Sequence, residues 1–228
     1  MSGLLVVSNT ILISTVIILV KWNTDFSRRF NNSVGYVPGS RLRSFLLNSL
    51  TCEPQVSLRR VILKKLSADL DETVSLSVPS GEFLTYFDRF ESHSPIQNNI
   101  RIGDRLLPAC SASGKLYLST FERPKSIELF KNTLVKRPAK KLITTQKGFS
   151  AELDTIQARG YAFDNEEWFD GMIGASVPIN NENGSLCACL STHSLTSRKK
   201  MNDLEAKIPT MEVAAKKLQR ILFRKDNN

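Results

Sequence analysis

The chain has 228 residues, which is enough for one domain with an appendage or for two small domains. Its hydrophobic content of 41% is ordinary for a protein that buries a core, and it excludes an intrinsically disordered chain. There are 31 lysines and arginines against 22 acidic residues, a formal net charge of +9 that favours a polyanion, an acidic small molecule or an acidic protein as partner. The cations concentrate in residues 27–65 and 131–147.

Nothing in the cysteine pattern indicates a secreted protein. The four cysteines are too few and too unevenly spaced for a disulfide framework, and no secretory cleavage signature accompanies them. We therefore expect a reducing compartment, with the cytoplasm as the default location.

Residues 4–20 are long and apolar enough to raise the question of a membrane span. No basic residue precedes them, and five hydroxyl or amide side chains interrupt them, those of Ser8, Asn9, Thr10, Ser14 and Thr15. We expect a helix that docks against protein, with no membrane contact. A membrane-anchored sensor is the least favoured alternative.

A small β-hairpin is predicted next. Residues 25–30 and 34–37 flank the turn Asn31-Asn32-Ser33, and Pro38-Gly39 ends the second strand. A helix followed by such a hairpin is the back half of a winged helix-turn-helix, in which the second helix enters the DNA major groove and the wing contacts the backbone. Two helices then follow, because apolar residues recur at helical spacing from Ser40 and again from Ser57.

The cations of this region have two interpretations. They could contact DNA phosphates, or they could lie on a solvated helix face, which is the usual position of a charge run. The candidates for DNA contact are Arg28, Arg29, Arg41 and Arg43.

The remainder of the chain predicts an α+β domain with one antiparallel sheet and flanking helices. Residues 73–79 alternate strictly between apolar and polar side chains, which predicts a half-buried strand. Further strands are expected at 82–90, 96–102, 171–179 and 185–193, and helices near 113–121, 124–132, 150–159 and from Leu204 to Leu222. The predicted domains are residues 1–39 (truncated winged helix), 40–70 (linker helices) and 71–228 (α+β domain).

Seven short motifs follow one another between residues 35 and 198. They are GYVPG at 35–39, DETVSL at 71–76, DRFES at 88–92, RIGDRL at 101–106, SASGK at 111–115, RGYAFDNEE at 159–167 and LTSR at 195–198. With these motifs in this order, the chain resembles the IclR family of bacterial transcriptional regulators over about residues 35–222. The resemblance implies a GAF/profilin-like effector-binding domain at 71–228, behind a DNA-binding winged helix.

The front of the chain departs from the family pattern. The family has three helices before its wing, whereas this sequence has room for one. Ser2-Gly3-Leu4 resembles the start of the recognition helix, but no lysine or arginine occurs before Lys21. A helix without such side chains makes few phosphate or base contacts, so we expect weak DNA binding without sequence preference.

The resemblance also implies that the α+β domain holds a small organic acid or aromatic metabolite beside its sheet. The positions that it implies are Ser111, Ala112, Ser113, Asp164, Met172, Gly174, Cys189, Ser191 and His193. Backbone N–H groups at 111–114 and the hydroxyls of Ser111 and Ser113 could hold a carboxylate at a helix N-terminus. The competing interpretation is a serine-capped helix with a close-packing glycine.

Metal binding and catalysis find less support. Alternation along 185–193 places Cys187, Cys189, Ser191 and His193 on one face, where the thiols and imidazole could bind zinc, but strand cysteines are more often small core residues. We expect no metal and no cofactor. Neither histidine lies in a catalytic motif, and the acidic residues Asp164, Glu166, Glu167 and Asp170 are expected at a solvated turn, so no enzyme is predicted.

The favoured function is a ligand-responsive transcriptional regulator, acting as a homodimer or homotetramer. The alternative is an effector-binding remnant that senses a metabolite without reading DNA.

Overall fold

The computed structural model describes residues 27–29, 36–38, 53–93, 100–134 and 140–222. The chain forms two compact units, Met1–Val56 and Ser57–Asn228. Among the described helices, none combines the length and the apolar character needed to cross a lipid bilayer.

The described part of the first unit contains the predicted hairpin. Strands β1 (Ser27–Arg29) and β2 (Tyr36–Pro38) are antiparallel, with Arg28 opposite Val37. The helix predicted at 4–20, the helix predicted from Ser40, and the candidate DNA contacts Arg41 and Arg43 lie outside the described residues.

The second unit is built on a six-stranded antiparallel sheet, so the α+β prediction is confirmed. The strand order is β5-β4-β3-β8-β7-β6. The strands are β3 (Val74–Ser80), β4 (Phe83–Phe90), β5 (Arg105–Leu106), β6 (Ala162–Asn165), β7 (Met172–Asn180) and β8 (Leu186–Leu195).

The strand predicted at 96–102 is wrong in its described part, because residues 100–102 do not pair. They enter a turn in which the Asp104 carboxylate accepts the Arg101 N–H and Gly103 has a φ of +95°. Gly103 and Asp104 within this turn exchange backbone hydrogen bonds with Tyr86 of β4, and the two-residue strand β5 follows directly. The short strand β6 was not anticipated either.

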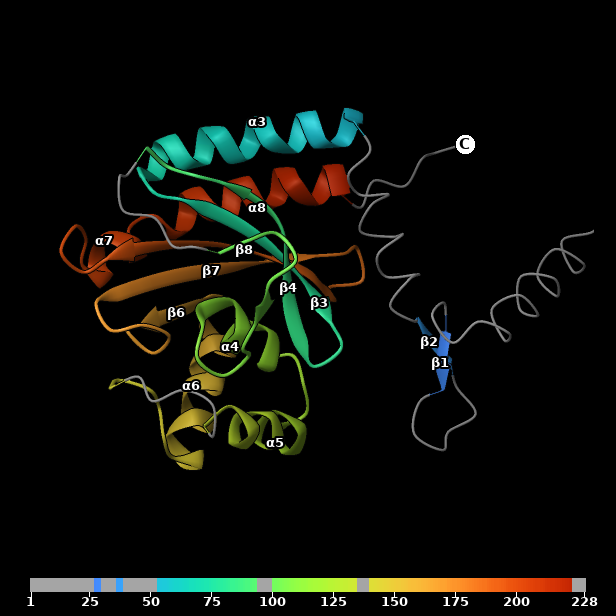
Figure 1. The fold of residues 1–228 in the computed structure, drawn as a ribbon, viewed down its shortest axis with the longest axis vertical. Helices are drawn as coiled ribbons and strands as arrows, with labels where there is room; N and C mark the ends of the chain where they lie inside the picture. Colours follow the sequence, from blue (N-terminus) through green and yellow to red (C-terminus); the bar gives the residue numbers. More distant parts are fainter. Residues whose placement is uncertain (1–26, 30–35, 39–52, 94–99, 135–139, 223–228) are drawn as a thin grey trace, which may run out of the picture. The chain divides into compact units, whose positions relative to one another are not determined.

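Helices cover both faces of the sheet (Figure 1). Helices α3 (Glu53–Leu70) and α8 (Ile208–Leu222) lie across one face, and α4 (Ala112–Leu118), α5 (Arg123–Leu134) and α6 (Gln146–Arg159) lie on the other. The predicted C-terminal helix is divided into α7 (Met201–Glu205) and α8. Pro209 explains the division, since proline is accommodated in the first turn of a helix but not in its interior.

The two faces of the sheet differ in polarity. Toward α3 and α8 the buried side chains are mainly apolar, including Val74, Leu76, Val177 and Leu190. The alternate positions, toward α4, include buried Ser75, Ser77, Ser176, Ser191 and His193. A polar face enclosed by helices is the structural setting of the candidate site.

Candidate functional site

A row of polar residues crosses the enclosed face of the sheet. The strand register aligns Arg89, Ser75, Ser191 and Ser176 on four neighbouring strands, β4, β3, β8 and β7. The three serines are no more than 1% exposed. Buried polar groups require hydrogen-bond partners, so such a row is unusual in a core unless it is satisfied internally or by a ligand.

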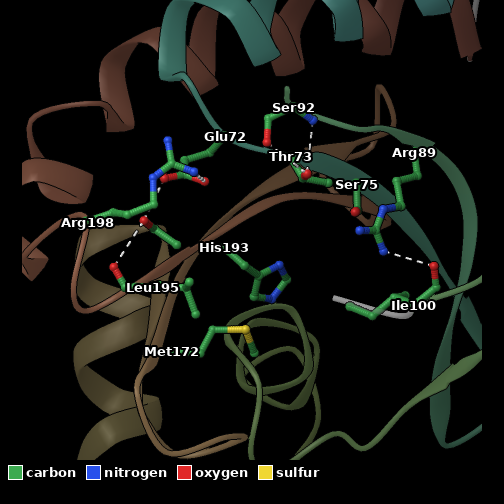
Figure 2. A pocket seen from close by; sticks show the side chains of 11 residues that line it. Glu72, Thr73, Ser75, Arg89, Ser92, Ile100, Met172, His193, Leu195 and Arg198 are labelled. Atoms are coloured by element: carbon green, nitrogen blue, oxygen red, sulfur yellow. Dashed lines mark hydrogen bonds and ion pairs between the residues drawn. The ribbon is translucent and has the colours of Figure 1, made fainter. Parts of the chain in front are cut away.

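One end of this row opens into a pocket, drawn in Figure 2. The pocket has a cavity volume of about 40 Å³. A water-sized sphere needs roughly 10–15 Å³ by the same measure, so the cavity holds a few waters or one carboxylate group. The lining residues are Glu72, Thr73, Ser75, Arg89, Ser92, Ile100, Met172, His193, Ser194, Leu195 and Arg198.

Arg89 supplies the positive charge of the pocket wall. Its side chain is only 6% exposed, and Nη1 donates to the carbonyl oxygen of Ile100 at 2.9 Å. Its Nε lies 3.6 Å from the carboxylate of Glu91, which is itself half-exposed. Burial lowers the pKa of Arg89 from its ordinary value. The guanidinium is therefore a largely dehydrated cation beside a cavity, which favours an anionic ligand.

His193 supplies a neutral imidazole on the opposite wall. Burial, followed by the positive charge of Arg89, lowers the pKa of His193 to about 4, so the ring is uncharged near pH 7. The edge of the ring packs against Trp168, with the centroids 5.7 Å apart. Gly174 lies opposite His193 in the ladder, and a Cβ there would come within 2.9 Å of the imidazole. The absent side chain of Gly174 makes space for this histidine.

A charged network closes the rim of the pocket beside His193. The hydroxyl of Ser194 donates to Glu72 at 2.6 Å, and the cations of Arg198 and Lys199 lie 3.6 and 3.5 Å from the same carboxylate. Arg198 also donates to the carboxylate of Asp71 at 3.0 Å. These contacts join the end of α3 to the loop that follows β8.

The predicted carboxylate site at the start of α4 has a different geometry. Ser111 is the N-cap, and its hydroxyl accepts the N–H of Gly114 at 3.1 Å. A Cβ on Gly114 would lie 2.3 Å from the carbonyl oxygen of Pro108, so this glycine is required by close packing. The arrangement is that of the competing interpretation. Ser111, Ala112 and Ser113 are buried, and none of the three lines the pocket.

Ser113 nevertheless contacts the polar row. Its hydroxyl lies 3.0 Å from that of Ser176, and its carbonyl oxygen accepts from the thiol of Cys189 at 3.8 Å. Ser191 donates to the carbonyl oxygen of Ser75 at 3.4 Å. Of these predicted residues, Ser191 contacts the pocket lining through Ser75, Ser113 and Cys189 do not line the pocket, and Met172 and His193 line it directly.

Asp164 is fully buried. Its Oδ1 accepts the N–H groups of Glu167 and Trp168 at 2.8 and 3.3 Å, whereas Oδ2 has no hydrogen-bond partner among the described residues. Burial, and then the charge of Glu167, raise the pKa of Asp164 to about 7.

The prediction of a solvated acidic turn is thus wrong for Asp164 and Glu167. The reason is Lys115, whose ammonium is buried 2.5 Å from Glu167 and 3.1 Å from Glu152, so that an internal cation replaces solvent. Glu166 instead pairs with Lys141.

Sequence reasoning missed Arg89 and Ser75 as site residues, and it missed Tyr86 as a buried residue of the same face. Tyr86 is buried on the enclosed face, its hydroxyl has no hydrogen-bond partner among the described residues, and burial raises its pKa. The alternation of 73–79 did identify a polar face with Ser75 and Ser77, but that face was assigned to solvent. Both serines are buried, which corrects the prediction of a half-buried strand.

The alternative metal site is not supported by a ligand cluster. Within the described ranges, no three histidine, cysteine or acidic side chains are grouped so as to hold an ion. Cys189 is buried and burial raises its pKa to about 12, which disfavours the thiolate form that metals bind. Cys187 is partly exposed.

Comparison with known proteins extends over most of the chain. The family model described as "Bacterial transcriptional regulator IclR C-terminal" matches residues 54–220. The "Probable transcriptional regulator SauR" of Cupriavidus necator is 28% identical over 180 residues, which are 79% of this chain and 71% of SauR. Several further curated relatives, all of them regulators, are matched over about two fifths to three fifths of their own length.

Solved structures share the fold. The IclR protein of Thermotoga maritima superposes with a TM-score of 0.63 and 26% identity, covering 94% of this chain and 86% of that one. The inducer-binding domain of PobR from Acinetobacter, solved as a double mutant with 3-hydroxybenzoic acid, gives a TM-score of 0.63 and 27% identity, covering 74% of this chain and 98% of that one. The chain therefore belongs to the IclR family of bacterial transcriptional regulators.

Proposed function

We propose that this protein is a ligand-responsive transcriptional regulator whose C-terminal unit binds a small organic or aromatic acid, and that occupancy of this site controls DNA binding. The observation that carries the proposal is the buried guanidinium of Arg89 beside a cavity on an enclosed polar sheet face. An arginine binds a carboxylate through two parallel N–H···O bonds, and the strength of such a pair rises when water is excluded.

The remaining lining suits the other end of such a ligand. Neutral His193 can donate or accept a hydrogen bond, and Thr73, Ser75 and Ser92 offer hydroxyls. Ile100 and Met172 provide apolar surface. The cavity as it stands holds only the carboxylate group, so a larger acid would require Met172 or the Ile100 segment to move.

The comparisons support this assignment without identifying the ligand. One structural relative is an inducer-binding domain with a hydroxybenzoic acid bound, and a curated relative is named the p-hydroxybenzoate hydroxylase transcriptional activator. An aromatic or aliphatic carboxylic acid is accordingly the proposed effector class.

The positions expected from the resemblance take two roles in this proposal. Met172 and His193 contact the effector, with Gly174 making space for the imidazole. Ser191 supports the wall through its bond to the carbonyl oxygen of Ser75, and Asp164 does so through Trp168, which packs against His193. Ser111, Ala112, Ser113 and Cys189 are buried residues that do not line the pocket. The carboxylate is assigned to Arg89 and not to the start of α4, because the Ser111 hydroxyl and the Gly114 N–H already bond each other.

DNA binding is proposed to be weak and independent of sequence, through phosphate contacts from Arg28 and Arg29 on β1 together with Arg41 and Arg43. The second candidate function is an effector-binding protein that senses a metabolite without reading DNA, and it is favoured by the lack of lysine and arginine in residues 4–20. A homodimer or homotetramer in the cytoplasm remains the proposed assembly and location.

A thermal-shift screen tests the effector site. The full chain is heated with a panel of sodium salts that includes acetate, pyruvate, benzoate and 3-hydroxybenzoate. We expect saturable stabilisation by at least one acid and none by its methyl ester or amide. Arg89→Met should abolish the shift and Arg89→Lys should weaken it. Arg105→Met, which removes an exposed cation from the neighbouring strand, should leave it unchanged. A shift that survives Arg89→Met would show that the anchor is elsewhere.

A further inference from the structure

We propose that Asp88 and Arg59 hold in place the part of the pocket wall that contains Arg89. Through this pair, binding of a ligand in the pocket changes helix α3. The inference rests on the proposed function, and it assigns the regulatory connection of that site. Its core observation is that two successive residues of β4 face in opposite directions. Arg89 faces the cavity, and Asp88 faces α3.

The contact between Asp88 and α3 is a buried ion pair. The Nε of Arg59 donates to Oδ2 of Asp88 at 2.5 Å, and both side chains are 2% exposed. The other oxygen of Asp88 accepts the backbone N–H of Arg89 at 2.8 Å. One carboxylate therefore joins helix α3 to the backbone of the residue that carries the pocket's guanidinium.

The strand is irregular at this point. Leu76 pairs with Asp88 and Ser77 pairs with Tyr86, so Phe87 is an extra residue in a β-bulge. The guanidinium of Arg59 also lies over the ring of Phe87, 5.1 Å from its centroid. Helix α3 thus holds both the bulged residue and its neighbour. A bulge interrupts the regular ladder, so it is a position at which a strand can shift locally.

A second set of contacts joins the opposite end of α3 to the pocket. Lys199 donates to the carbonyl oxygen of Leu70, the last residue of the helix. Arg198 bonds Asp71 and lies near Glu72, and both Arg198 and Glu72 line the cavity. The pocket wall is consequently connected to α3 in its first half and at its end, and Figure 2 shows Arg198 beside Glu72 in the second connection.

Two further observations favour a regulatory role over a purely stabilising one. A buried ion pair loses much of its Coulomb energy to desolvation, so it is a weak source of stability compared with apolar packing. In addition, α3 begins at Glu53 in the first unit and continues into the second, which starts at Ser57. It is the segment through which any change in the second unit reaches the first along the chain.

The expected sequence of events is local. A carboxylate that binds Arg89 competes with Ile100 and Glu91 for the guanidinium and fixes β4 at residues 88–89. Asp88 and Phe87 then hold Arg59 more firmly, and α3 becomes more rigid. Coupling between two sites is reciprocal, so loss of the Arg59–Asp88 pair must also weaken carboxylate binding, although Arg59 does not touch the ligand.

Amide hydrogen exchange on the full chain tests this connection, with 3-hydroxybenzoate and pyruvate as probes. We expect the better probe to slow exchange at residues 59–66 by about fivefold, the lower end of common allosteric couplings. The double variant Arg59→Met/Asp88→Asn removes both charges together, which avoids leaving one of them buried and unpaired. In this variant, the probe should no longer slow exchange at residues 59–66. By the same reciprocity, the variant should bind the probe about fivefold more weakly. Lys65→Met, which breaks an exposed pair within α3, should retain both.

The outcomes separate the two proposals. If a probe stabilises the protein but exchange in residues 59–66 is the same in its presence and absence, the connection is refuted and the effector site stands. If neither probe binds, hydrogen exchange without ligand tests the connection between Arg89 and α3. The four proteins compared are the wild type, Arg89→Met, the double variant, and the double variant that also carries Arg89→Met. Arg89→Met should then speed exchange in residues 59–66 in the wild-type background but not in the double variant. Equal rates in all four proteins would overturn the connection.

Discussion

Gly174 and His193 face each other across the β7–β8 ladder, and the space left by the missing side chain of one is occupied by the ring of the other. Gly174→Ala would place a methyl group 2.9 Å from Cδ2 of the imidazole and 3.2 Å from the carbonyl oxygen of Thr192. We expect a loss of about 1–3 kcal/mol in the free energy of unfolding, the usual effect of overpacking. Urea denaturation measures this loss.

The same substitution should displace His193 and reduce carboxylate-dependent stabilisation. Gly184→Ala is the matched control, because its φ of +80° makes alanine unfavourable there while no neighbouring atom meets the new methyl group. If both variants retain the full thermal shift with acid, His193 is not part of the effector site.

The sequence could predict a site residue only where it indicated which face of the strand is covered by helices. The apolar alternation at 73–79 correctly predicted β3, but burial of its polar face depends on α4 packing over it, and no local pattern reveals such packing. The bulge at Phe87 is a second cause. Strict alternation would place Tyr86 and Arg89 on opposite faces, and the extra residue brings them to the same one.

Long, strongly patterned elements were the easier part. The hairpins, α5, α6 and the C-terminal helical region were anticipated from periodicity and turn residues. A serine-capped helix was one of the two interpretations of residues 111–114, and the structure assigns the cap to Ser111. Lys115 was not recognised as a buried cation, because its acidic partners Glu152 and Glu167 lie 37 and 52 residues away in sequence.

The stability of the protein should depend on pH through His193. Its pKa is lowered from 6.5 to about 4 in the folded state, so the unfolded chain binds the proton more tightly. The stabilising contribution is therefore complete above pH 6.5 and is lost as the pH falls from there to about 4, by roughly 3 kcal/mol in all. Urea titrations between pH 4.5 and 7 should show a shallower pH dependence for His193→Gln than for the wild type. Parallel curves would contradict the buried neutral imidazole.

Titration of Asp164 should make the stability of the protein depend on pH in the opposite direction. Its pKa is raised from 3.8 to about 7, so the folded state binds this proton more tightly and stability from this group falls as the pH rises through that interval. Asp164→Asn keeps an oxygen for the N–H groups of Glu167 and Trp168 but carries no charge. We expect the variant to match or exceed the wild type in unfolding free energy at pH 8, and its advantage to shrink toward pH 5. The opposite result would be an unfolding free energy of Asp164→Asn that falls further below the wild-type value at pH 8 than at pH 5. It would show that Asp164 is ionised and paired within the folded protein.

Lys115 should be among the most sensitive positions in the second unit. Its ammonium is buried between Glu167 and Glu152, and removal of one partner from a buried ion pair typically costs about 3–5 kcal/mol because the other charge is left uncompensated. Lys115→Met should lower the free energy of unfolding by that amount, as measured by urea denaturation at pH 7. Lys115→Met/Glu167→Gln removes one charge of each sign and should recover a substantial part of the loss. If the double variant is as unstable as Lys115→Met alone, the contribution of Lys115 comes from the packing of its methylene groups and not from its charge.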